Sequence, residues 1–178
     1  GNAEAFKAFK ETKQSVESTV ADLQSRFGNE GAIAGPLAKL SATWAPLGKS
    51  ADQIVASEAA VLALAGNADR FATQVPNLQA QLNEVVRAMS AGGAPSSQIY
   101  SALQQVVLAG TMARRVTEIR AGGAGAATAG DALGRDAVLF DQVLDGLRDG
   151  NPDLGIAAVR NGAALTALQN SQTLWTAM

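Results

Sequence analysis

The chain has 178 residues and contains neither His nor Cys. It therefore lacks the side chains needed for thiol nucleophiles, disulfides, imidazole acid–base catalysis and the usual zinc or haem ligand sets. Its 14 Lys and Arg residues against 16 Asp and Glu residues give a net charge of −2, too small a field to attract nucleic acid or an anionic membrane. We expect no enzymatic activity, no cofactor, no metal and no nucleic-acid partner.

The residue content favours helices that pack through small side chains. Hydrophobic residues make up 47% of the chain and aromatic residues only 4%. Alanine is the commonest apolar residue and has the highest helix propensity. The longest wholly apolar run, Ala59 to Ala65, is far shorter than the roughly 20 residues that a membrane-spanning helix needs. These features indicate an all-α protein without a membrane span in this sequence.

Apolar residues spaced alternately three and four apart predict a first helix over residues 6–27. We call such a row of residues along one helix face a seam, and Lys13 lies on the seam of this helix. Glycines and Pro36 end this helix, and two further seams cover residues 37–54 and 61–89. These two seams are out of phase near Ser57 and Glu58, so we expect a local overwinding that places a polar residue on the seam. Pro46 and Pro76 are predicted kinks.

The second half of the chain contains three more predicted helices, and the first of them is followed by a connector. After a turn at 91–97, Ser96 or Ser97 is the expected N-cap of a helix that ends near Arg120. Its predicted seam is Ile99, Leu103, Val106, Ala113 and Val116. Residues 121–130 contain only Ala, Gly and Thr, and we expect a connector because the spacing of a phosphate-binding loop is absent.

The last two predicted helices follow this connector. The first covers residues 133–147 and is closed by Gly150. Asn151, Pro152 and Asp153 match an N-cap, a first-turn proline and a first-turn acid, so the last helix is predicted to begin there.

We expect an all-α fold, an antiparallel helical bundle made of two stacked, related modules over residues 1–95 and 96–178. A shift of 131 residues places Phe9 on Phe140 and Trp44 on Trp175, and the Phe–Trp separation is 35 residues in both pairs. The same shift places Asp22 on Asp153 and Leu23 on Leu154. The alternative to an internal repeat is that two similar helical hairpins match by chance. The first module is expected to lack its N-terminal part.

Five long blocks carry a family resemblance. They are FKAFKETKQSVESTVADLQ, LSATWAPLGKSADQIV, VVLAGTMARRVTEIRAGG, GDALGRDAVLFDQVLDGL and LTALQNSQTLW. From about Ala5 to Met178 the chain resembles the periplasmic sensory region of PilJ-type methyl-accepting chemotaxis receptors, which serve type IV pilus twitching motility. The resemblance implies a helical ligand-binding region between two membrane helices of an inner-membrane protein. The start at Gly1 and the uncapped end at Met178 likewise lead us to expect a segment of a longer protein.

The resemblance also implies partners. Type IV pilin is the expected partner outside, and a coupling protein with a histidine kinase is expected inside through cytoplasmic regions absent here. Receptors of this kind usually act as homodimers. PilJ-type modules also occur in nitrate-sensing kinases, whose basic helical box binds the anion. The segment GTMARR, which contains Arg114 and Arg115, is similar to that box only in outline.

Seven residues are therefore candidate sites. Arg114 and Arg115 are candidates for ligand contact, against the alternative of a solvated or salt-bridged helix face. Trp44 and Trp175 are candidates for partner contact, against packing in the core. Three polar seam residues are candidates for a signalling role, against simple setting of the helix register: Glu58, Asn161 and Gln172.

The sequence predicts a sensory, non-enzymatic module that detects pilin or surface contact and signals to a kinase. Two alternatives remain open. One is a receptor domain for a small solute or anion, with a pocket between helices. The other is a structural or adaptor bundle that does not switch. Asp136, Asp141 and Asp145 form no acid–base or metal-binding pattern that supports catalysis.

Overall fold

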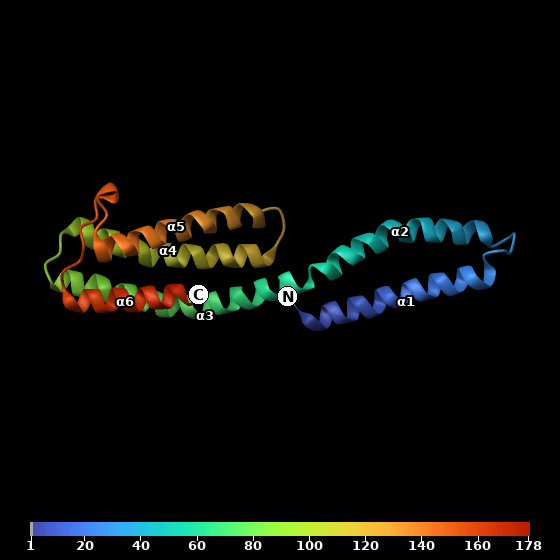
Figure 1. Ribbon diagram of the computed structural model, residues 1–178, viewed down its shortest axis with the longest axis horizontal. Helices are drawn as coiled ribbons and strands as arrows, with labels where there is room; N and C mark the ends of the chain where they lie inside the picture. Colours follow the sequence, from blue (N-terminus) through green and yellow to red (C-terminus); the bar gives the residue numbers. More distant parts are fainter. Residues whose placement is uncertain (1) are drawn as a thin grey trace. The chain divides into compact units, whose positions relative to one another are not determined.

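The computed structural model describes residues 2–178, and its elements there are helical (Figure 1). The helices are α1 (Ala3–Phe27), α2 (Ala34–Ala56), α3 (Glu58–Ala91), α4 (Ser96–Ala121), α5 (Ala126–Asp149) and α6 (Gly162–Thr176), with a 3-10 turn at Pro152–Leu154. The described residues contain no strand, and Asn151 and Ile156 form one isolated β-bridge. The prediction of an all-α helical bundle is confirmed.

The chain divides into two compact units, one ending at Ala65 and the other running from Gly66 to Met178. The predicted module boundary at 95–96 lies in the turn between α3 and α4, inside the second unit. The turn does not separate the two units, because α3 supplies part of the second unit's core. Leu78, Leu82 and Val85 of α3 are completely buried there.

The first unit is built on the α1–α2 hairpin. Asn2 begins α1 by accepting hydrogen bonds from the backbone N–H groups of Glu4 and Ala5. Along α1 no residue is buried, whereas α2 buries Leu37, Gly48 and Ala51. This hairpin therefore has a seam but almost no enclosed core.

The phase slip near Ser57 is a helix end. α2 stops at Ala56, and α3 begins at Glu58. The hydroxyl of Ser57 donates to the carbonyl of Ile54 at 2.8 Å, and its backbone N–H donates to the carbonyl of Gln53 at 3.1 Å. Because the Ser57 hydroxyl bonds the backbone locally, it competes with continuation of the helix. The predicted phase slip therefore coincides with a one-residue break between α2 and α3 at Ser57.

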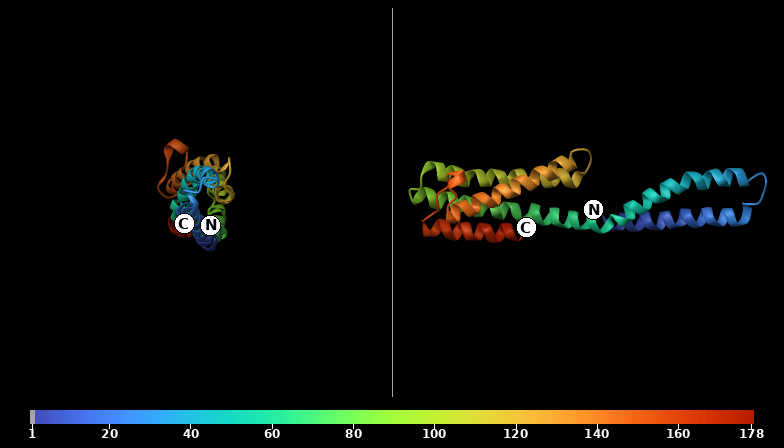
Figure 2. Two further views of the ribbon diagram at one scale, coloured as in Figure 1. Left: turned by 90° about the vertical axis from the view of Figure 1, so that its right-hand side faces the viewer. Right: turned by 45° about the horizontal axis from the view of Figure 1, so that its top comes forward.

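The second unit packs α4, α5, α6 and the latter part of α3 around one core (Figures 1 and 2). The most deeply buried large side chains are Phe140, Leu78, Leu82, Met89, Met112, Leu144, Leu147 and Leu168. Small residues fill the remaining helix contacts, as at Ala102, Ala109 and Ala164, which are fully buried. The abundance of alanine predicted these close contacts.

The structure corrects the predicted inward face of α4. Ala102, Gln105, Ala109 and Met112 are the buried residues of this helix, while Leu103, predicted on the seam, is 44% exposed. The larger side chain was assigned to the core from hydrophobicity alone. Close packing of the helices instead selects alanine for the inward face.

Two predicted helix starts in this unit were also wrong. α4 begins at Ser96 after Pro95, and neither Ser96 nor Ser97 is its N-cap. α5 begins at Ala126, so the second half of the predicted connector is helical. Ala129 and Ala132 lie buried in this first part of α5, which stabilises helix in a segment that the glycines alone disfavour.

The last helix begins later than predicted. Asn151 caps only the 3-10 turn, through the Leu154 N–H, and α6 starts at Gly162 with Asn161 as its N-cap. The intervening segment buries Ile156 and Val159 without helical structure, because Gly155 turns the chain with φ +65°. The start of the helix was predicted too early because these apolar residues continue the helical spacing of the sequence, although they belong to a loop.

Two of the residue pairs in the proposed internal repeat differ in local structure. Asp22 and Leu23 lie within α1, but Asp153 and Leu154 lie in the 3-10 turn. Among the described residues, no helix is both long enough and apolar enough to cross a membrane.

Candidate functional site

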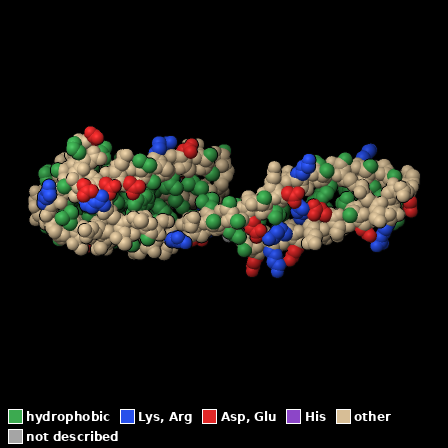
Figure 3. Space-filling view, in the orientation of Figure 1, with side chains coloured by type: hydrophobic (Ala, Val, Ile, Leu, Met, Phe, Trp, Pro, Cys, Tyr) green, Lys and Arg blue, Asp and Glu red, His purple; other side chains and the backbone are tan. Residues whose placement is uncertain are grey.

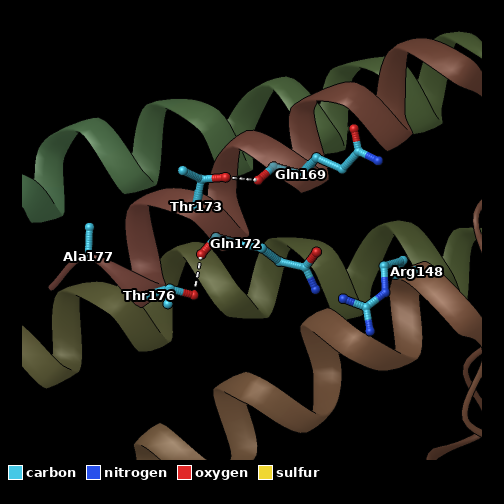
Figure 4. Close-up of a pocket in the computed structure, with 6 residues that line it drawn as sticks. All are labelled: Arg148, Gln169, Gln172, Thr173, Thr176 and Ala177. Carbon is cyan, nitrogen blue, oxygen red and sulfur yellow. Dashed lines mark hydrogen bonds between the residues drawn. The ribbon is translucent and has the colours of Figure 1, made fainter.

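A polar depression lies along α5 and α6 (Figure 4). Its volume is about 750 Å³, and it is lined by Arg148, Gln169, Gln172, Thr173, Thr176 and Ala177. Asp145 Oδ1 accepts a hydrogen bond from Gln172 Nε2 at 3.1 Å and lies 3.1 Å from Arg148 Nη2. Gln172, predicted to be a signalling residue, thus joins α6 to a charged pair on α5.

The charges in this depression are already paired. Asp149 accepts hydrogen bonds from Arg148 Nε at 2.9 Å and from Arg148 Nη2 at 2.7 Å. These bonds, with the attraction between the charges, lower the pKa of Asp149 below its ordinary value and raise the pKa of Arg148. Thr173 and Thr176 donate to carbonyls of their own helix (Figure 4). The depression therefore presents a polar surface whose charged side chains are already paired.

Trp175 lies in an aromatic cluster on α6. Its ring centroid is 4.6 Å from that of Phe140 on α5 and 6.4 Å from that of Phe71 on α3. Its indole N–H donates to Asp141. The residue is partly buried, with its apolar part on the core and its polar edge at the surface. Trp175 therefore connects three helices of the second unit.

The two candidate arginines have different surroundings. Arg115 Nε donates to Asp136 of α5 at 2.6 Å, and both side chains are largely covered, with 30% and 18% of their surface exposed. Arg114 is exposed and makes a long hydrogen bond of 3.5 Å to Thr111. The structure therefore does not direct both guanidinium groups to one ligand, and a role for either in binding stays a prediction.

The remaining candidates of the first unit lie near a set of ion pairs. Lys13 Nζ contacts Glu17 at 2.6 Å and Asp52 at 2.9 Å, and these carboxylates raise the pKa of Lys13 above its ordinary value. Glu58 accepts a hydrogen bond from Lys10 at 2.9 Å, which links the start of α3 to α1. Trp44 is half-buried on α2.

Asn161 has a structural position that differs from its prediction. It precedes α6, and its Oδ1 accepts a hydrogen bond from the Ala164 N–H at 3.0 Å. It is an N-cap and not a polar residue on the helix seam. The periodic pattern missed this because it was continued through the loop before α6.

Sequence reasoning did not single out two other residues of interest. Asp136 was noted only as an acid without a catalytic pattern, and its pairing with Arg115 depends on how α4 and α5 align. Gln105 is only 2% exposed, yet its Oε1 accepts no hydrogen bond from any of residues 2–178. The small residues at 102 and 109, with Met112, have the helical spacing that could have placed Gln105 on the inward face.

Comparison with known proteins gives related receptor sequences. No protein-family model matches the chain. The chain is 33% identical to the protein PilJ of Pseudomonas aeruginosa, in an alignment that covers 98% of this chain and 26% of PilJ. It is 34% identical to a protein of Alcanivorax borkumensis with the provisional name methyl-accepting chemotaxis AlkN, over 94% of this chain and 24% of that protein.

The chain thus spans about a quarter of the length of these two relatives. Their names agree with the resemblance carried by the sequence blocks. The chain is a PilJ-like domain, homologous to one region of chemotaxis receptors of the PilJ type.

Proposed function

We propose that this chain is the periplasmic sensory region of a type IV pilus chemoreceptor, which responds to contact with pilin or a surface. A histidine kinase and a coupling protein would read the signal through cytoplasmic regions of the same receptor, and the output would control twitching motility. Homology to a protein named PilJ supports this function.

Homology to the protein named PilJ is the observation that carries the proposal. An uncovered apolar stripe in the first unit bears on how such a receptor would assemble. Ile33, the N-cap of α2, and Leu40, Leu47 and Ile54 within α2 are spaced seven residues apart and are 39% to 56% exposed. We call these four residues the α2 stripe. Residues at this spacing lie on one face of a helix, as they do in coiled coils. Figure 3 shows hydrophobic side chains gathered between α1 and α2, with charged side chains beside them.

We assign the α2 stripe to contact with a second copy of the receptor. A lone pair of helices encloses little apolar surface, and α1 has no buried residue. Two such hairpins can form a four-helix bundle that covers both stripes. Lys13, the charge on the α1 seam, is already paired with Glu17 and Asp52, so a dimer contact need not bury an unpaired charge.

A sensory role also requires two helix arrangements with different affinity for the stimulus. Shifting an equilibrium from 1:99 to 99:1 takes roughly 5.5 kcal/mol of differential binding. Small side chains at the helix contacts of the second unit, such as Ala102, Ala109 and Ala167, interlock less than large ones. They favour small displacements of the helices as the response to pilin.

The test uses the full-length receptor in its own membrane. Leu40→Gln combined with Leu47→Gln should abolish the pilus-dependent signalling output while leaving receptor abundance unchanged. The matched control is Ala45→Gln, an exposed position of α2 outside the stripe. Normal pilus-dependent output from the stripe variant would overturn the dimeric sensory assignment. If the unaltered receptor assembles stably but its signalling output does not change when pili are present or absent, the alternative of a non-switching adaptor bundle is favoured.

A further inference from the structure

A second cavity, lined by residues of α4 and α5, is separate from the polar depression. Its volume is about 460 Å³, within the range of small-molecule sites. Its walls are mostly apolar and include Leu103, Val107, Leu139 and Val143. Leu103 and Val107 are 44% and 66% exposed, although large apolar side chains at such positions gain free energy when covered.

Gln105 gives this cavity a specific polar group. The side chain lines the cavity and is 2% exposed, and its Nε2 donates to the Ser101 carbonyl at 3.4 Å. Its Oε1 accepts no hydrogen bond from any described residue. A buried acceptor without a donor is costly, and the terminal torsion of a glutamine turns easily. A ligand that donates one hydrogen bond would remove this cost.

The lining also limits the charge of the ligand. The other polar side chains are those of Tyr100, Gln104 and Thr111, and none of the lining residues is charged. The Thr111 hydroxyl donates to the Val107 carbonyl of its own helix, so it adds little further polarity to the cavity. An ion would lose its hydration here without gaining a partner of opposite charge.

We infer that the α4–α5 cavity binds a small neutral ligand with an apolar body and one hydrogen-bond donor, which bonds to Gln105. This site goes beyond the proposed detection of pilin and does not depend on it. Binding at this position would restrain α4 against α5.

The binding test uses the full 178-residue chain and the probe N-phenyl-1-naphthylamine. This probe is neutral, has a single N–H donor, and fluoresces more strongly in apolar surroundings. We expect saturable binding with one probe per chain and a dissociation constant of roughly 10 µM. Its N-methyl derivative lacks the donor and should bind about fivefold more weakly, the loss expected for one hydrogen bond.

Two substitutions locate the site. Gln105→Met keeps the side-chain length and removes the acceptor, so the two probes should bind it equally. Val107→Lys should abolish binding by placing a charge in the cavity, whereas the matched control Val138→Lys should not. Val138 is similarly exposed, on α5 outside this cavity.

Three results would overturn the inference. The first is the absence of saturable probe binding, and the second is an equal effect of Val107→Lys and Val138→Lys. The third is equal binding of both probes to the unaltered chain, since Oε1 would then play no part. The unaltered chain could instead bind no probe and form a dimer. If Val107→Lys then dissociated this dimer, the surface would be a protein contact and not a ligand site. All these measurements are independent of receptor signalling, so they can fail while the proposed function stands.

Discussion

Asn161 and Gly92 illustrate how single residues fix the end of the second unit. Asn161 Oδ1 caps α6 by accepting a hydrogen bond from the Ala164 N–H. A Cβ atom at Gly92 would lie 2.6 Å from Asn161 Nδ2. Any side chain at position 92 would therefore push the capping amide away. The glycine in the α3–α4 turn and the cap of α6 act together, although 69 residues separate them in the sequence.

Asn161→Ala should lower the free energy of unfolding of the second unit by about 1 kcal/mol, because α6 loses its N-cap. The same substitution at Asn67, an exposed position within α3, should slightly increase stability because alanine has the higher helix propensity. Urea denaturation followed by circular dichroism measures both changes. Equal effects at the two positions would contradict the capping role of Asn161.

Arg114 and Arg115 should differ in their contribution to stability. Arg115→Ala should cost about 1 kcal/mol, since it breaks a partly buried ion pair with Asp136, whereas Arg114→Ala should change stability by less than about 0.5 kcal/mol. A double-mutant cycle with Asp136→Ala isolates the pair. A coupling free energy near zero would mean that the Arg115–Asp136 contact contributes nothing to the α4–α5 packing.

At the scale of helices, Trp175 holds α6 against its neighbours. It contacts Phe71 of α3 and Phe140 of α5, and its N–H bonds to Asp141. α6 has 15 residues, too few to be stable as an isolated helix in water. Its stability therefore comes from packing, and Trp175 supplies a large part of that contact.

Trp175→Ala should destabilise the second unit by about 3 kcal/mol, the cost of removing a large aromatic side chain from a core contact. Trp175→Phe keeps an aromatic ring in this contact but loses the hydrogen bond to Asp141 and part of the ring area, so its cost should be smaller, about 1 to 2 kcal/mol. Chemical denaturation of the second unit gives both values. An equal loss in the two variants would show that the ring contacts are unimportant.

The structure also shows which helical features are readable from sequence. The heptad spacing predicted α1 correctly, because a single amphipathic period covers the whole helix. It failed at the start of α6, where Ile156 and Val159 are buried in a loop and imitate a helical period. It failed on α4, where packing selects Ala102 and Ala109 for the inward face rather than Leu103. Such choices depend on neighbouring helices that one sequence does not specify.

The candidate site was less predictable than the fold. The sequence singled out Gln172 as a polar seam residue and Trp175 as a candidate for partner contact, but not their hydrogen-bond partners Asp145 and Asp141 on α5. Those partners depend on the alignment of α5 with α6. The unpartnered acceptor of Gln105 likewise appears only when the surrounding helices are in place.

The hairpin of α1 and α2 should respond to alkaline pH through Lys13. Its pKa is raised in the fold, so its ion pairs contribute fully below its ordinary pKa of 10.5 and are lost as pH rises through the raised value. Stability should therefore fall less steeply above about pH 10.5 in Lys13→Met than in the unaltered chain. Circular dichroism at increasing pH measures this difference.

Lys49→Met is the matched control because Lys49 is an exposed lysine of the same hairpin. This variant should keep the pH dependence of the unaltered chain. If Lys13→Met keeps it as well, the contacts of Lys13 with Glu17 and Asp52 do not stabilise the hairpin.

At the scale of the whole molecule, the two units differ in how complete they are. The second unit encloses its own core, with Phe140, Leu144 and Leu168 almost fully buried. The first unit leaves the α2 stripe exposed and buries nothing of α1. We therefore expect the second unit to keep its fold in a monomer and the first unit to gain stability from a second copy.

Disulfide crosslinking in the membrane tests this dimeric arrangement most directly. The 178 residues contain no Cys, so single cysteines can be introduced into a full-length receptor freed of any others. Two copies inserted in one membrane run in the same direction, which brings identical residues of the α2 stripe together. Leu47→Cys should crosslink efficiently under mild oxidation, and Ala45→Cys should not. Equal crosslinking at both positions, or none at Leu40→Cys, Leu47→Cys and Ile54→Cys, would contradict the assignment of the stripe to a receptor dimer.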